Sequence, residues 1–106
     1  LSSASRFVRA SFTKLNAAKK EDEMGSVTQF FHILSSVEQT EGCVEVEGKL
    51  ERTAYSACMN CDKGIYYYKT YDNSQITAVD LFKENLDLSS LKTFPLEKTQ
   101  KIKYLN

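Results

Sequence analysis

The sequence has no tryptophan, a single proline, one histidine and only three cysteines among its 106 residues. Secreted domains stapled by disulfides carry more cysteines, in even number, so a reducing compartment such as the cytoplasm is expected. Acidic and basic residues are equal in number, and the formal net charge is zero. Nucleic acid and anionic membrane surfaces attract basic chains, so we expect neither as a partner.

Long hydrophobic runs are absent as well. No apolar stretch approaches the roughly 18–20 residues of a membrane-spanning helix. The start of the chain has none of the charged-then-apolar pattern of a secretory signal. Hydrophobic residues make up 42% of the sequence, which is typical of a soluble globular protein, and the length suits one compact domain.

A first amphipathic helix is predicted near the N-terminus. Val8, Phe12 and Leu15 recur at the spacing of one helical face. Ser3 or Ser5 is a suitable N-cap, because a serine oxygen can accept a hydrogen bond from the first-turn amides.

A second helix is predicted after the charged connection at residues 19–23, with Ser26 as a candidate N-cap. Two amphipathic helices joined by a short connection are expected to pack side by side. The apolar stripe of the second helix comprises Val27, Phe30, Phe31, Leu34 and Val37.

The periodicity then becomes strand-like. Residues 52–59, 64–71 and 75–81 are rich in β-compatible side chains and are separated by turn residues, which predicts a three-stranded antiparallel meander. Residues 91–96 and 101–105 are candidates for further short strands. Two helices packed on one face of such a meander make an α+β fold.

Tyrosines occupy both faces of the predicted middle strand. Tyr67 and Tyr71 point one way, and Tyr66 and Tyr68 the other. A single layer of helices covers only one face of a sheet, so this pattern suggests that structure from outside the chain covers the other.

The sequence Cys58-Met59-Asn60-Cys61 is a CxxC motif. A structural zinc site needs four ligands, and neither Cys43 nor His32 has matching spacing. A redox pair needs its first cysteine at a helix N-terminus, whereas this one ends a strand. We therefore favour small side chains near a turn over a metal or redox site, and we expect no metal or other cofactor.

Other polar residues are also interpreted as structural. His32 flanks the apolar stripe of the second helix, and no nucleophile or orienting acid stands at a spacing that would make it catalytic. Glu45, Glu47 and Glu51 alternate with other residues, as on the wet side of an exposed strand.

Arg6 is placed against a local electrostatic preference, although residue statistics alone favour a solvated arginine at such a position. It lies in the first turn of the predicted helix, where a cation opposes the helix dipole. Such a charge requires either solvent or a specific anionic partner. Arg9 lies on nearly the same face, and residue statistics alone do not separate the two.

Four blocks of the chain resemble the C-terminal third of bacterial bile salt hydrolases, which are members of the choloylglycine hydrolase family. The likeness extends from Ser2 nearly to Asn106, and the four blocks occur in the family's order and spacing. They are SRFVRA (5–10), QFFHILSSV (29–37), KGIYYYKTYDNSQI (63–76) and ENLD (84–87).

The resemblance implies an N-terminal-nucleophile hydrolase with an αββα sandwich, whose second sheet would cover the tyrosines. Such enzymes cleave the linear amide that joins a bile acid to glycine or taurine. The thiol of an N-terminal cysteine attacks the carbonyl, and its own α-amino group handles the proton. A family arginine beside that cysteine falls on Arg6, which is our predicted catalytic residue. A conjugated bile acid would be the ligand of the intact enzyme, which we expect to be a homo-oligomer.

The chain departs from the family at its first residue, which is Leu1, whereas the family's nucleophilic cysteine is the first residue of the mature chain. Cys43, Cys58 and Cys61 are all internal. We therefore expect residues 1–106 to be the C-terminal portion of a hydrolase domain whose N-terminal portion is missing. This polypeptide alone is expected to be inactive.

Three alternatives stay open on the sequence. The chain resembles penicillin V acylases of the same family, which share the fold and nucleophile. It is also compatible with a non-catalytic binding module that reuses the fold, or with a small metal or redox protein built on the CxxC motif. An incomplete domain should expose apolar surface, whereas an independent module should not.

Overall fold

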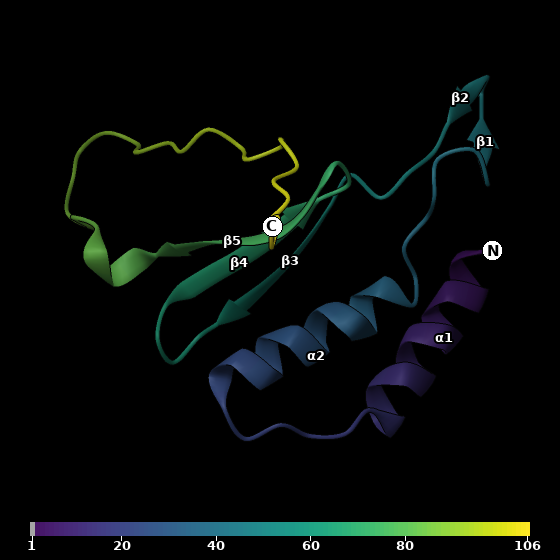
Figure 1. The fold of residues 1–106 in the computed structure, drawn as a ribbon, viewed down its shortest axis with the longest axis horizontal. Coiled ribbons are helices and arrows are strands. Elements are labelled where there is room, and N and C mark those ends of the chain that lie inside the picture. Colours follow the sequence, from purple (N-terminus) through teal and green to yellow (C-terminus); the bar gives the residue numbers. More distant parts are fainter. Residues whose placement is uncertain (1) are drawn as a thin grey trace. The chain divides into compact units, whose positions relative to one another are not determined.

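The computed structural model describes residues 2–106 (Figure 1). They form two compact units, of which the first ends at Thr53 and the second begins at Ala54. Helices dominate the first unit and an antiparallel sheet dominates the second, which confirms the α+β class. Leu1, the first residue of the given sequence, lies outside the described residues. No helix in the described part of the chain has the length and apolar character needed to cross a bilayer.

Helix α1 spans Ser3–Asn16 and is capped by Ser2. The Ser2 hydroxyl accepts a hydrogen bond of 3.1 Å from the backbone N–H of Ser5. The prediction of Ser3 or Ser5 as the cap is therefore wrong. Ser2 has the extended backbone of an N-cap, and Ser5 supplies the first-turn amide that needs an acceptor.

The apolar stripe of α1 is not buried within the described residues. Val8 is 65%, Phe12 67% and Leu15 81% exposed. The half-buried residues of the helix are 6, 10, 11 and 13, and the C-cap at residue 17 is half-buried as well. An amphipathic helix with its apolar face in solvent indicates a surface that another structure covers.

Helix α2 spans Glu23–Ser35 and begins earlier than predicted. Its N-cap is Asp22, whose Oδ2 accepts a hydrogen bond of 3.0 Å from the N–H of Gly25. The prediction of Ser26 as the cap is wrong, because Ser26 lies within the first turns. The acidic residues assigned to the connection instead cap and begin the helix, where the dipole favours negative charge.

The two helices contact each other, as predicted. The Gln29 side-chain amide donates a hydrogen bond of 3.0 Å to the carbonyl of Ala18, in the connection between them. Val27 and Phe31 of the predicted stripe are buried, at 9% and 4% exposure, whereas Phe30 is 44% exposed.

A small hairpin that the sequence did not predict follows α2. Strand β1 (Glu45–Val46) pairs antiparallel with β2 (Lys49–Leu50). Glu47 and Gly48 between them both have positive φ, 51° and 77°, as a type I′ turn requires. Glu45, Glu47 and Glu51 are all exposed here, as expected.

The second unit contains the predicted meander. Strands β3 (Tyr55–Asn60), β4 (Ile65–Thr70) and β5 (Asn73–Asp80) pair antiparallel in the order β3-β4-β5. Strand β5 begins at Asn73, which was expected in the turn; Asn73 is 2% exposed and pairs with Thr70. The 3-10 helix η1 (Leu81–Lys83) follows.

The strands predicted at residues 91–96 and 101–105 do not form. The C-terminal segment instead lies irregularly against the meander (Figure 1). The Glu97 N–H donates to the Tyr68 hydroxyl at 3.0 Å, and the Ser74 N–H donates to Gln100 Oε1 at 2.8 Å. Pro95 has no N–H to donate to a strand ladder. The segment is held instead by these two bonds from backbone N–H groups to side-chain acceptors.

Two tyrosines of the middle strand are buried, one on each face of the sheet. Tyr67 is 5% and Tyr68 7% exposed, and their side chains point to opposite faces of the sheet. The expectation that one face of the strand lacks cover from the chain itself is therefore wrong at Tyr67 and Tyr68, whereas Tyr66 is half-buried and Tyr71 is exposed. Beside Tyr68, the cover comes in part from the chain's own C-terminal segment, through the bond from Glu97.

Replacing Tyr68 by Phe should release the C-terminal segment. The Glu97 N–H would lose its acceptor, which costs roughly 1 kcal/mol for a partly buried amide. Limited trypsin digestion should then cleave after Lys98 faster than in the unmodified chain. Tyr66→Phe is the matched control, because the Tyr66 hydroxyl has no hydrogen-bond partner within residues 2–106. Equal cleavage rates in the two variants would contradict the tether.

Candidate functional site

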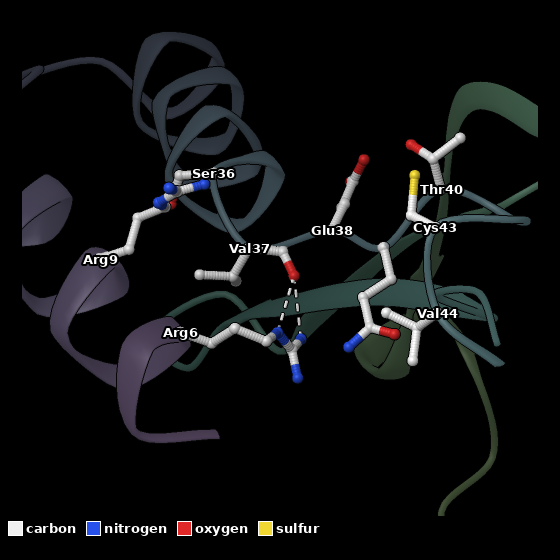
Figure 2. Close-up of a pocket in the computed structure, with 9 residues that line it drawn as sticks. Arg6, Arg9, Ser36, Val37, Glu38, Thr40, Cys43 and Val44 are labelled. Atoms are coloured by element: carbon white, nitrogen blue, oxygen red, sulfur yellow. Dashed lines mark hydrogen bonds between the residues drawn. The ribbon is translucent and has the colours of Figure 1, made fainter. Parts of the chain in front are cut away.

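Arg6 is held by the carbonyl oxygen of Val37. Its Nε donates at 3.1 Å and its Nη2 at 2.9 Å, so two donors on one edge of the guanidinium converge on one acceptor (Figure 2). Both bonds are part-buried and join residues 31 positions apart in the chain. A planar guanidinium bonded through two donors has a defined orientation, which a single contact would not provide.

The Val37 carbonyl lies just beyond the C-terminus of α2. The last carbonyls of a helix have no partner within the helix and form the negative end of its dipole. Arg6 opposes the dipole of α1 but faces the favourable end of α2. Within residues 2–106, its partner is thus a helix terminus rather than an acidic side chain.

Local bonds define where this carbonyl lies. The N–H of Ser36, the C-cap, donates to the carbonyls of Ile33 and Leu34. The Ser36 hydroxyl donates to Ile33 at 2.7 Å, and the Val37 N–H donates to Leu34 at 3.1 Å. The last turn of α2 is therefore tightened, and Val37 leaves it in a defined direction.

The structure separates Arg6 from Arg9, which the sequence did not. Arg9 is exposed and has no hydrogen bond or ion pair within residues 2–106. Both arginines line an open cleft of about 190 Å³ together with residues 36–40, 43 and 44 (Figure 2). Of the two, Arg6 alone is half-buried and oriented.

The CxxC motif lies where the sequence predicted, at the end of β3. Cys58 is in the strand and half-buried, and Cys61 is exposed in the following turn. Burial raises the pKa of the Cys58 thiol above its usual value, which disfavours the reactive thiolate. No cluster of three or more potential metal ligands (His, Cys, Asp or Glu) occurs among the described residues.

The remaining polar candidates lie away from the cleft. His32 is exposed in the last turn of α2, where the dipole favours a cation, and it does not line the cleft. The glutamates of the hairpin region do not line it either. Cys43 does, a placement that the sequence did not indicate.

Comparison with protein families identifies the family of the chain. The model of the linear amide C–N hydrolases, choloylglycine hydrolase family, matches residues 1–94. The chain belongs to the choloylglycine hydrolase family. The resemblance inferred from the four sequence blocks is confirmed.

Curated members of this choloylglycine hydrolase family match most of the chain. The bile salt hydrolase/transferase of Lactiplantibacillus plantarum is 61% identical over 97 residues, which cover 91% of this chain and 30% of that protein. The bile salt hydrolase/transferase of Clostridium perfringens is 43% identical, over 97% of this chain and 32% of that protein. The chain thus spans about a third of the length of these relatives.

A solved structure of the family has the same fold. A cysteine-to-alanine variant of the conjugated bile acid hydrolase of Clostridium perfringens superposes with a TM-score of 0.83 at 39% identity. The match covers 99% of this chain and 32% of that structure. The expected fold family is confirmed. These relatives are bile salt or conjugated bile acid hydrolases, which does not favour the penicillin V acylase alternative.

The cysteines of this choloylglycine hydrolase chain should differ in reactivity. Because burial raises the pKa of Cys58, its thiolate fraction at neutral to mildly alkaline pH is below that of an unperturbed thiol. Iodoacetamide should therefore alkylate the exposed Cys61 and Cys43 before Cys58, as measured by peptide mass spectrometry over time. Fastest modification at Cys58 would instead favour a redox role for the CxxC motif.

Proposed function

We propose that this chain is the C-terminal third of a bile salt hydrolase, which cleaves the amide bond between a bile acid and glycine or taurine. The observation that carries the proposal is the 61% identity to the Lactiplantibacillus plantarum enzyme across 91% of the chain. The remaining two thirds of the domain, including the N-terminal cysteine, would lie upstream of residue 1.

The exposed face of α1 supports an incomplete domain. Phe7, Val8, Phe12 and Leu15 are each at least 65% exposed on this helix. Burying apolar surface contributes roughly 25 cal/mol per Å² to stability. A partner that covered these large side chains would therefore stabilise the fold substantially. The upstream portion of the same domain is the partner that we propose for this face.

The proposed reaction follows the family chemistry. The cysteine thiol, in the upstream portion, transfers its proton to its own α-amino group and attacks the amide carbonyl carbon. The C–N bond then breaks, and the leaving glycine or taurine amine takes that proton. Water hydrolyses the resulting thioester, which releases the bile acid and restores the thiol.

Arg6 is the residue of this chain that we propose for the catalytic site. Its Nε and Nη2 are bonded to Val37, whereas Nη1 has no partner within residues 2–106. A fixed cation with a free edge can orient an acidic neighbour or stabilise negative charge that develops in the transition state. The bond to Val37 supports this role because it holds the guanidinium in place before substrate binds.

Two further expectations belong to the same proposal. The intact hydrolase would work in the cytoplasm, which suits a chain with three free cysteines. It would also bind a conjugated bile acid as its substrate and would assemble as a homo-oligomer.

A chimera would test the proposed function directly. The N-terminal two thirds of the Lactiplantibacillus plantarum enzyme would be joined to this chain in place of its own matching third. Release of glycine from glycocholate should occur with the chimera and not with the chain alone. A soluble, folded chimera without activity, or glycine release by the chain alone, would contradict the proposal.

Substitutions in the chimera would test Arg6. Arg6→Lys keeps the charge but removes the planar fork, and we expect kcat to fall by about 100-fold, the scale of losing one transition-state donor. Arg9→Lys is the matched control from the next turn of α1 and should retain activity within about twofold. Equal losses in the two variants would argue against a specific role for Arg6.

A further inference from the structure

A reciprocal pair of hydrogen bonds joins Gln39 and Thr53. The Gln39 N–H donates to the Thr53 hydroxyl at 2.8 Å, and the Thr53 N–H donates to the Gln39 carbonyl at 3.1 Å. Both residues are half-buried. The side chain and the backbone of one threonine thus satisfy both backbone groups of a residue 14 positions earlier.

This pair closes a loop that contains the β1–β2 hairpin. Within the loop, the Glu51 N–H donates to the Val44 carbonyl at 2.8 Å. The two sides of the loop are therefore joined a second time, between the Gln39–Thr53 pair and the hairpin. Val37 lies two residues before Gln39. The carbonyl that holds Arg6 is therefore anchored on one side by the last turn of α2 and on the other by Thr53.

We propose that Thr53 is a positioning residue for Arg6, acting through Gln39 and the Val37 carbonyl. The inference rests on the catalytic role of Arg6 in the proposed function, and it assigns no contact between Thr53 and substrate. Thr53 holds the segment that follows α2, and the segment holds the guanidinium in one orientation. No sequence motif marks Thr53, because its partners are backbone groups.

The hydroxyl is the part of Thr53 on which this role depends. Without it, the half-buried Gln39 N–H has no acceptor, and a single backbone bond, from the Thr53 N–H, remains to close the loop. The segment can then shift, and the Val37 carbonyl shifts with it. Small displacements of a positioned group reduce the rate of the chemical step more than they weaken ground-state binding.

Variants of Thr53 in the chimera separate positioning from stability. Thr53→Val keeps the shape and removes the hydroxyl; we expect kcat to fall about tenfold with KM unchanged within about twofold. Thr53→Ser restores the hydroxyl and should recover most of kcat. Thr77→Val is the control: Thr77 is half-buried in β5, and its hydroxyl has no hydrogen-bond partner within residues 2–106.

A double-mutant cycle with Arg6→Lys tests whether the effect passes through Arg6. If it does, Thr53→Val should lower kcat little further in the Arg6→Lys background. Full activity of Thr53→Val, or equal losses in both backgrounds, would overturn the inference.

A spectroscopic measurement distinguishes failure of this inference from failure of the proposed function. If Arg6→Lys retains full activity, the catalytic role of Arg6 is wrong, and kinetics no longer report on its position. The NMR signal of the Arg6 Nε–H in the chimera then decides. A shifted or faster-exchanging signal in Thr53→Val, restored in Thr53→Ser, supports positioning; an unchanged signal overturns it.

Discussion

The first unit is organised around the hydrogen bonds from Arg6 to the carbonyl of Val37. They place a cation from the start of α1 at the negative end of α2 and satisfy a carbonyl that the helix itself leaves unpaired. The tightened last turn of α2 and the Gln39–Thr53 pair lie on either side of that carbonyl. One side chain therefore links the two helices to the loop that bears the β1–β2 hairpin.

This arrangement allows the same arginine to have both a structural role and the catalytic role that we propose for it. Capping a helix uses two donor groups of the guanidinium and fixes its plane. The remaining edge is then presented in a defined direction. A residue whose orientation is built into the scaffold incurs little reorganisation when charge develops nearby, which is the property that a hydrolase site requires.

In the second unit, an irregular C-terminal segment covers part of one face of the sheet, where a regular helix or strand would otherwise lie. The C-terminal segment forms no strand, yet its backbone at Glu97 donates to Tyr68 on one face of β4. The apolar stripe of α1, by contrast, remains in solvent. Membership of the choloylglycine hydrolase family, together with a span of about a third of its relatives, supports our proposal that an upstream portion of the domain covers that stripe.

The sequence by itself determined the two helices, the three-stranded meander and the family, because apolar periodicity, β-propensity and four motif blocks are local properties. Helix starts were misplaced, since Ser2 and Asp22 are selected by backbone geometry that Ser3, Ser5 and Ser26 do not have. Only the tertiary structure decided that the partner of Arg6 is Val37 and that Thr53 closes the following loop. In each of those contacts a side chain bonds a backbone group far away in the chain. A backbone group has no side-chain signature in a sequence, so the sequence does not mark it as a partner.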